Sequence, residues 1–404
     1  MTTQSLGSRR LPRLTLSLAP WVAVILLIIA YPPSWETYAD LSSPDAINAV
    51  KEHDSARDRG GNAPIGFDHF SYFARATSDG DPYLAGRAPY AHRPLVPAIV
   101  RAIFPLVAPR SGFRVLAILG VLLQLLAIAR LLSDVDCRPI LVAGALACLS
   151  ALPGLALPLR YPLIIDALAW AGVLWGWWAA RNSRFLLASL SMALAVLVHE
   201  VALVGLFPVL LSLSSNPNKA NPRLAWAVMI GLPAIAFALP RMLVETTWRP
   251  SLRLLDRIDP ALVSITFLPE FLYGLGVASL VSPLLIKDLR RNATATQRQL
   301  SHEAASLAVP LLLAVIALPL AIGRLLVLGG AAAAILLALW LELQQPRIRV
   351  LVLAAWILTS LVTAISWSVR SNTAYVAAAS ALSLLALILI LRPPLTSTRT
   401  SATP

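Results

Sequence analysis

Asp68 stands among aromatic side chains in a polar stretch of the chain, within residues 66–73 (GFDHFSYF). A carboxylate there has the chemistry of a general base, and rings such as that of Tyr72 offer faces for a sugar or a lipid. The alternative is structural. An Asp that precedes a helix caps free N–H groups, and a helix starting at His69 would give Asp68 that role. The residues alone leave both roles open.

A second cluster lies in residues 88–97 (APYAHRPLVP), where Arg93 precedes a proline at the expected start of a helix. The guanidinium offers a planar fork of donors for a phosphate, and the helix start offers unpaired N–H groups. Tyr90 and His92 are candidates for substrate contact beside it. Arg and Tyr also anchor helices at membrane interfaces, so anchoring is the alternative role of Arg93.

Acidic residues and a histidine recur within apolar sequence further along the chain. Arg160 and Asp166 lie at the start of one apolar run, and His199-Glu200 stands between two others. Ionisable groups at membrane depth cost free energy and usually serve a function, here substrate binding. The alternatives are an ion pair between Arg160 and Asp166, and a polar plug at a helix break for His199 and Glu200.

Three further arginines, Arg249, Arg253 and Arg324, lie in short polar segments between apolar runs. Guanidinium groups there are candidates for neutralising a lipid phosphate. Ordinary anchoring at the membrane interface is the alternative role.

The elements that must position these residues are helices in a membrane. The chain of 404 residues is 58% hydrophobic and only 13% charged, whereas soluble domains carry about 25% charged residues. The apolar runs are long enough to span a bilayer and do not alternate with polar residues, so the spans are helices rather than barrel strands. The net charge of +13 does not indicate nucleic-acid binding, because the basic residues sit in short gaps between apolar runs. Two cysteines indicate neither a disulfide framework nor a metal site, and we expect no cofactor.

The apolar runs also predict the topology. They cover 17–31, 112–132, 139–157, 162–180, 184–198, 200–213, 224–240, 262–286, 304–321, 325–343, 349–367 and 374–392. With twelve crossings, most basic gaps share one side, which the positive-inside rule makes cytoplasmic. Both termini then lie in the cytoplasm. This count requires a break near His199-Glu200 that turns residues 184–213 into a hairpin of short helices.

We therefore expect an all-α polytopic membrane protein with about twelve transmembrane helices and a large first extracytoplasmic loop that ends in a juxtamembrane helix. The expected segments are 1–16 (cytoplasmic N-terminus), 17–31 (first helix), 32–111 (extracytoplasmic loop), 112–240 (N-terminal transmembrane module), 241–261 (second extracytoplasmic loop), 262–392 (C-terminal transmembrane module) and 393–404 (disordered cytoplasmic tail).

This layout resembles the C-type superfamily of membrane glycosyltransferases, multi-helix enzymes with a large first outside loop. In one bacterial branch that loop reads roughly Tyr-Asp-Gly-Gln-Phe-Tyr-Tyr and later Tyr-Arg-Tyr-Arg-Arg-x-Leu-x-Pro. Here residues 67–73 (FDHFSYF) and 90–97 (YAHRPLVP) stand in those places, and the second keeps Arg-x-Leu-x-Pro. Asp166 and Glu200 sit where the branch has an Asp opening a helix and a Glu in a short-helix hairpin. The resemblance covers roughly residues 1–215, and His69-Phe70 replaces the Gly-Gln of the branch.

The resemblance implies a glycosyltransferase at the outer face of a bacterial cytoplasmic membrane, with Asp68 as general base of an inverting displacement. It implies a polyprenyl-phosphate-linked sugar as donor, a glycan, lipid or protein as acceptor, and membrane lipids as partners. The alternative is a transporter or lipid flippase, in which a proton or the substrate would pass along Asp166, His199 and Glu200. That class explains the long outside loop poorly, and the sequence has no internal repeat typical of it. A non-catalytic partner in envelope assembly is the third class.

Overall fold

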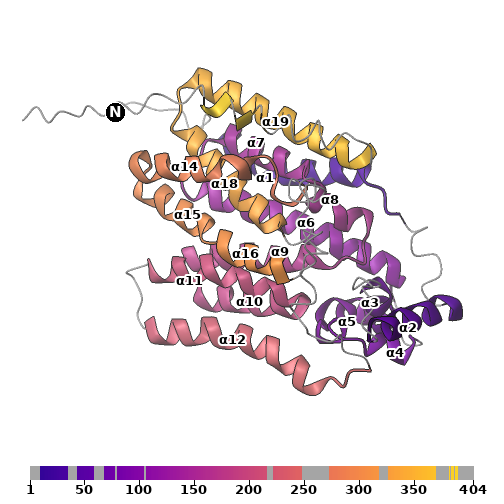
Figure 1. The fold of residues 1–404 in the computed structure, drawn as a ribbon. Coiled ribbons are helices and arrows are strands. Elements are labelled where there is room, and N and C mark those ends of the chain that lie inside the picture. Colours follow the sequence, from indigo (N-terminus) through magenta and orange to yellow (C-terminus); the bar gives the residue numbers. More distant parts are fainter. Residues whose placement is uncertain are drawn as a thin grey trace, which may run out of the picture.

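Helices form the regular structure of the computed structural model, and the residues that it describes contain no strand (Figure 1). The structure describes residues 10–34, 43–58, 68–77, 80–103, 106–215, 222–247, 273–317, 326–369 and a few positions between 382 and 389. The all-α fold class predicted from the apolar runs is therefore confirmed for this part of the chain.

Several helices are long and apolar enough to cross a membrane. Judged by length and composition, three helices qualify in the part of the chain that the structure describes, at Pro109–Ser133, Arg223–Leu243 and Pro346–Ile365. A fourth span results if the pair Pro139–Ser150 and Pro153–Arg160, bent by 57°, counts as one. The apolar segments Leu18–Ala30, Phe185–Val198, Glu200–Ser214 and Val327–Glu342 are shorter. These properties indicate a membrane protein.

The N-terminal part of the bundle is built around α6, α9 and α10. Its helices are α1 (Arg10–Ala30), α6 (Pro109–Ser133), α7 (Pro139–Ser150), α8 (Pro153–Arg160), α9 (Asp166–Arg181), α10 (Phe185–Val198), α11 (Leu206–Ser214) and α12 (Pro222–Leu243). Gly120 lets α6 and α9 approach closely, because a Cβ atom there would lie only 2.8 Å from Ala167. Close contact through small residues is how helices associate in lipid, where burial of apolar surface gives no advantage.

The bend between α7 and α8 has a local cause. Pro153 opens α8, and a residue before proline is driven out of the helical region, as Leu152 is with φ −72° and ψ 119°. The run expected over 139–157 is thus two helices.

The C-terminal part of the bundle is made of α14 (Ala278–Asn292), α15 (Ala295–Ala305), α16 (Ala308–Ala317), α18 (Val327–Glu342) and α19 (Pro346–Val369). α15 falls in a polar gap where the apolar runs predict no helix. Its start is fixed by a capping box, in which the Thr294 side chain accepts from the Gln297 N–H and the Gln297 side chain accepts from the Thr294 N–H. Capping chemistry therefore defines this helix where hydrophobicity does not.

Residues 199–205 interrupt the helical run expected to contain a break. His199 is extended, with φ −155° and ψ 122°, and separates α10 from the 3-10 helix η3 (Glu200–Gly205), which continues into α11. Asp166 at the start of α9 lies beside His199 at the end of α10, so these two helices are antiparallel. The break at His199-Glu200 is therefore present.

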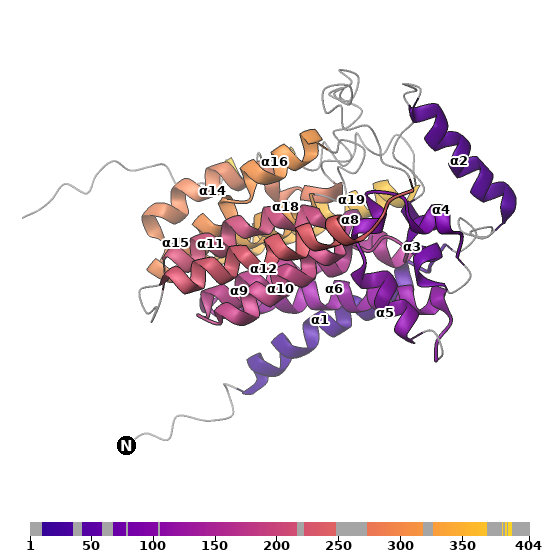
Figure 2. The same cartoon turned by 90° about the horizontal axis from the view of Figure 1, so that it is seen from below.

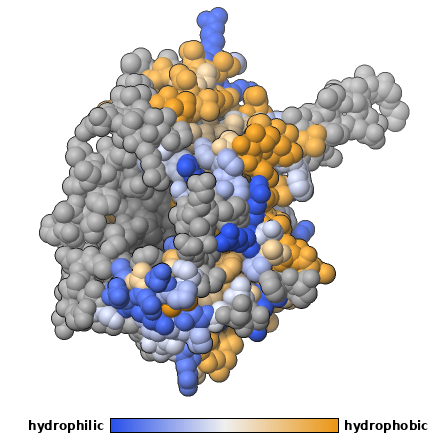
Figure 3. All heavy atoms as spheres, turned by 90° about the vertical axis from the view of Figure 1, so that its right-hand side faces the viewer, coloured by the Kyte–Doolittle hydropathy of each residue, from blue (hydrophilic) through white to orange (hydrophobic). Residues whose placement is uncertain are grey.

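A group of short helices, here called the polar subdomain, lies at one end of the bundle (Figures 1 and 2). It consists of α2 (Pro44–Asp58), α3 (Asp68–Ala76), α4 (Pro82–Ala85), the 3-10 helix η2 (Tyr90–His92) and α5 (Leu95–Ile103). Seen end-on, hydrophilic residues gather on the lower left of this end, and hydrophobic ones lie at the top and along the right side (Figure 3). α5 docks the subdomain on the bundle, with Val96, Pro97 and Val100 buried.

Polar contacts tie helices together at the other end of the bundle. Glu303 on α15 accepts from Trp177 Nε1 at 2.7 Å and from Arg181 Nη1 at 2.6 Å, both at the end of α9. Asp166 is at the start of that helix, so this cluster and the polar subdomain lie at opposite ends of α9.

Candidate functional site

A buried ion pair joins the polar subdomain to the broken helical hairpin. Arg93 donates from Nε to Glu200 Oε2 at 2.7 Å and from Nη2 to Glu200 Oε1 at 2.6 Å. The fork of Arg93 is thus fully engaged by one carboxylate, the strongest geometry available to such a pair. Arg93 itself is only 5% exposed. The sequence motif predicts that Arg93 binds a phosphate, whereas in the structure Arg93 binds the carboxylate of Glu200.

The local backbone conformation at Arg93 and at Glu200 directs the two side chains toward each other. Arg93 ends η2 with φ −113° and ψ 69°, outside the helical region as expected before Pro94. Glu200 is the first residue of η3, directly after the extended His199. Each residue stands at a sharp change of backbone direction, where its side chain can leave the helical cylinder and meet a partner far away in sequence.

Tyr72 completes the coordination of Arg93. The Nη1 group of Arg93 donates to the Tyr72 hydroxyl at 2.7 Å, and Tyr72 is fully buried on α3. Burial works against the charge of Arg93, but the attraction of Glu200, aided by Tyr72, outweighs it and holds the pKa of Arg93 well above its ordinary value. The cation is therefore permanent.

Asp166 and His199 adjoin this pair. His199 Nε2 lies 3.7 Å from Asp166 Oδ1, and both side chains are almost completely buried. His199 Nδ1 accepts from the Val201 N–H at 3.2 Å and lies 4.0 Å from Glu200 Oε2. The fold thus brings together residues that the sequence offers as separate candidates.

Tyr90 lies between two guanidinium groups. Its ring centroid is 5.6 Å from Cζ of Arg93 and 5.4 Å from Cζ of Arg87, within the range of cation–π attraction. Tyr72 and Tyr90 meet edge to face at 5.6 Å. The expectation that Tyr90 belongs to the site agrees with this placement, and half-buried His92 follows two residues later in η2.

Sequence reasoning missed a second buried pair. Arg87 donates to Asp54 from Nε and Nη2, each at 2.7 Å, and from Nη1 to Ser71 Oγ at 3.2 Å. The Tyr83 hydroxyl also donates to Asp54, at 3.0 Å. Asp54 lies on α2 and Arg87 in the turn between α4 and η2, 33 residues apart, so no local spacing reveals their pairing. Their complete burial is the only signal, and it exists only in the fold.

Arg241 is a further cation near the site, absent from the candidates drawn from sequence. It lies in the last turn of α12, close enough to Glu200 and Arg93 to interact electrostatically with both. Its Nη1 donates to the Phe237 carbonyl at 2.8 Å, and the guanidinium packs 3.8 Å over the Phe237 ring. It is half-buried. Unlike Arg93, it makes its described hydrogen bond to a backbone carbonyl.

The remaining candidates have different placements. Asp68 is the first residue of α3, four residues before Tyr72, and its side chain lies outside the described part of the structure. Arg249, Arg253 and Arg324 also lie outside the described residues. Arg160, at the end of α8, packs over the rings of Tyr161 and Trp367. The structure thus places Arg160 on an aromatic surface.

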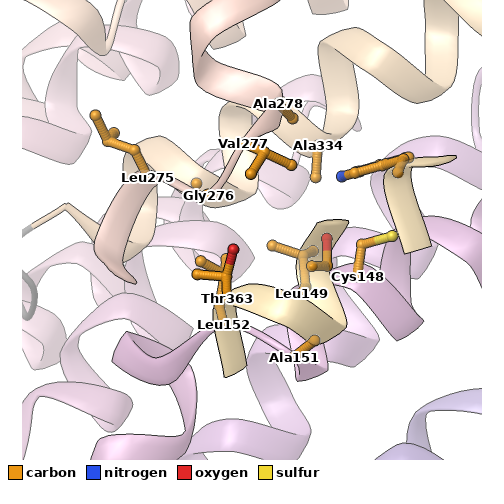
Figure 4. Close-up of a pocket in the computed structure, with 13 residues that line it drawn as sticks. Cys148, Leu149, Ala151, Leu152, Leu275, Gly276, Val277, Ala278, Ala334 and Thr363 are labelled. Carbon is orange, nitrogen blue, oxygen red and sulfur yellow. The ribbon is translucent and has the colours of Figure 1, made fainter. Parts of the chain in front are cut away.

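Two narrow clefts lie inside the bundle. One, lined by residues such as Cys148, Leu275 and Thr363, has room for roughly a single water molecule (Figure 4). The other is equally small and reaches Asp166 beside Gln124. Neither is large enough for a sugar. Among the described residues, no group of three or more His, Cys, Asp or Glu side chains is placed to hold a metal ion.

Comparison with known proteins adds no relative. No protein-family model matches the chain, and neither a curated protein nor a solved structure is detectably similar to it. The geometry of the site therefore carries the functional argument.

Proposed function

We propose that this protein is a membrane glycosyltransferase that moves a sugar from a polyprenyl-phosphate donor to an acceptor at the outer face of a bacterial cytoplasmic membrane. One observation supports this most. Five side chains from four distant segments meet where the polar subdomain contacts the bundle: Tyr72, Arg93, Asp166, His199 and Glu200. Two of them, Asp166 and Glu200, stand where the resembled branch has an Asp that opens a helix and a Glu in a short-helix hairpin.

In the proposed topology the chain crosses the membrane twelve times, with both termini in the cytoplasm. The polar subdomain then lies outside, over the end of the bundle that carries the Arg93–Glu200 pair. The break at His199 supports this arrangement, because it lets α10 and α11 run in opposite directions and keeps the basic cluster at 287–298 on the cytoplasmic side.

The proposed reaction is a single displacement at the anomeric carbon. Asp68 takes the proton of an acceptor hydroxyl while the hydroxyl oxygen forms its bond to the anomeric carbon. The bond from that carbon to the phosphate oxygen breaks, and polyprenyl phosphate leaves with the electron pair. Attack from the opposite face inverts the configuration. Removing a proton in this way contributes about 10²–10⁴-fold in rate.

The phosphate gains negative charge as it leaves, so a nearby cation would stabilise it. The hydrogen bonds of the arginines near the site favour some of them over others for this role. The Nε and Nη2 groups of Arg93 both donate to Glu200, so we assign Arg93 a role in orienting the site and not in binding the phosphate. Half-buried Arg241 is the better candidate among the described residues, with Arg249 and Arg253 following in sequence. A fixed cation at developing negative charge stabilises the transition state.

A transporter or flippase is the second candidate function. Asp166, His199 and Glu200 at a break between two helices are the observation that favours it. A carrier must release its ligand, however, and the Glu200 carboxylate is fully occupied by a permanent cation. The closed Arg93–Glu200 pair therefore favours the enzyme over the carrier.

The test is single-turnover sugar transfer by detergent-purified protein with a labelled polyprenyl-phosphate sugar. Asp68→Asn should insert and fold normally yet turn over at least about 100-fold more slowly, the low end for losing a general base. Asp68→Glu should keep partial activity at best. Asp45→Asn is the matched control, because Asp45 lies exposed in the first turn of α2.

Asn can still cap a helix, so a purely structural Asp68 predicts nearly normal turnover in Asp68→Asn. That outcome, at matched thermal stability, would remove Asp68 as the base. Movement of the intact lipid-linked sugar across vesicles, without transfer, would favour the transporter.

A further inference from the structure

His199 occupies the joint between two helices and touches both acids of the site. Its backbone N–H donates to the Ala195 carbonyl at 2.9 Å, the last bond of α10, and its carbonyl accepts from the Ala202 N–H at 3.0 Å, within η3. The same residue therefore ends one helix and begins the next. Glu200, which holds Arg93, is its direct neighbour.

The hydrogen bond that the imidazole accepts indicates its tautomer. Nδ1 accepts from the Val201 N–H, so in the neutral ring the proton sits on Nε2, which faces Asp166. A carboxylate opposite a ring N–H fixes both the tautomer and the orientation of a histidine. Asp166 on α9 thereby sets the plane of a ring that caps η3.

Capping decides where Glu200 points. The first turn of a helix has unpaired N–H groups, and the cap that satisfies one of them also sets the direction in which the turn begins. The carboxylate of Glu200 must leave that turn toward Arg93, which lies 107 residues earlier in sequence. A shift of the turn by about 1 Å would misalign the fork, and displacements of that size can cost about 10²-fold in rate.

We propose that His199 is a positioning residue, which holds η3 against Asp166 through its two ring nitrogens and so orients Glu200 to lock Arg93 and Tyr72 in the site. It touches no substrate in this scheme. The activity readout of its test rests on the proposed function, whereas the structural readout rests on the fold alone.

Three substitutions separate the two contacts of the ring. His199→Asn keeps an oxygen that can accept from the Val201 N–H but cannot reach Asp166. His199→Gln keeps an N–H group that can reach Asp166 but displaces the cap. His199→Phe fills the space and loses both contacts. His302→Phe is the matched control, because His302 lies exposed on α15, away from the site.

The kinetic expectation is graded. Turnover should fall about 100-fold in His199→Phe and about tenfold in His199→Asn and His199→Gln, with the donor KM little changed. His199→Asn should keep nearly the thermal stability of the wild type, because the cap is retained. A merely structural role would make turnover follow stability. Wild-type turnover in His199→Phe, or an equal loss in His302→Phe, would overturn the proposal.

The second readout needs no substrate. The chain has five histidines, so ¹⁵N-histidine labelling gives a spectrum in which the His199 signals are those missing from His199→Gln. At pH 7.5 we expect a protonated Nε2 and an unprotonated Nδ1, with the Nε2 signal moving in Asp166→Asn. The opposite tautomer, or no response to Asp166→Asn, would refute the inference. If the wild type transfers no sugar, the proposed function fails and this spectrum alone decides the role of His199.

Discussion

Arg93 and Glu200 form a two-pronged ion pair across 107 residues, with both nitrogen–oxygen distances at or below 2.7 Å. The pair links a short helix of the polar subdomain to the hairpin made by α10 and α11. It leaves Arg93 with Tyr72 as its only other described side-chain hydrogen-bond partner. The site is therefore assembled from charge pairs within the protein before any ligand arrives.

Breaking this pair on the acidic side should be costly. Glu200→Gln leaves the buried Arg93 cation without its carboxylate, a change typically worth about 3–5 kcal/mol of unfolding free energy. Thermal denaturation in detergent should show the loss, and the double variant Arg93→Met/Glu200→Leu should lose less than the two single variants together. Arg93→Lys should also weaken activity, since an ammonium cannot replace the fork.

The comparison pair is Arg138 with Glu342, 2.8 Å apart with 52% of the Arg138 side chain exposed. Arg138→Gln should cost at most about 1 kcal/mol, because exposed ion pairs are largely screened by water. Equal losses in Arg138→Gln and Glu200→Gln would contradict the burial argument.

Gly86 should tolerate no side chain. Thr247, just after α12, donates from its N–H to the Gly86 carbonyl at 3.0 Å and from its hydroxyl to the Tyr83 carbonyl at 2.7 Å. A Cβ atom on Gly86 would lie 2.7 Å from Thr247 Cγ2. Gly86→Ala should therefore lower the melting temperature, and adding Thr247→Ala should restore part of it.

Gly231 on α12 provides the control, because a Cβ atom there meets nothing within 4 Å. Gly231→Ala should be neutral or stabilise by up to about 1 kcal/mol, the usual gain within a helix. A normal melting temperature in Gly86→Ala would show that the Thr247 contact is dispensable.

Cys137 should resist alkylation in the folded protein. Burial, together with the nearby Glu342 carboxylate, raises the pKa of its thiol to about 12. The raised pKa keeps the thiol protonated from pH 7 to 9, and only the thiolate reacts readily. Cys148 is buried as well.

Maleimide at pH 8 should therefore label the native protein negligibly and label both cysteines after denaturation, as read by mass spectrometry. Ser215→Cys, at an exposed position, should label in the native state. Rapid native labelling of Cys137 would show that the turn between α6 and α7 opens.

The proposed orientation has a direct test. Reporter fusions at Asn218 and Thr294 should read cytoplasmic, and fusions at Asn62 and Arg253 should read outside, because the basic gaps mark the cytoplasmic side. An outside signal at Thr294 would mean that residues 184–213 cross the membrane only once. That result would remove the twelve-helix arrangement.

Hydrophobic pattern and motif spacing predict some features of this protein and miss others. Apolar runs predict the helical class, and the distribution of basic gaps between them predicts the break near His199-Glu200. Long-range partners escape such reasoning. Arg93 reads as a phosphate ligand because its sequence neighbours say nothing of Glu200, and the Asp54–Arg87 pair has no local signature at all. The start of α15 depends on capping by Thr294, which apolar periodicity ignores.

The distance in sequence between Arg93 and Glu200 also constrains how the protein is made. At about 5–20 residues per second, ribosomes need about 5–20 seconds to synthesise the 107 residues between them. During that interval Arg93 has no carboxylate partner, and burying an unpaired cation costs several kcal/mol of free energy. The subdomain should therefore dock on the bundle only after the hairpin has formed. The helices that form the hairpin thus assemble before the polar subdomain docks on them. A chain truncated before residue 200 should leave the subdomain undocked and accessible to proteases.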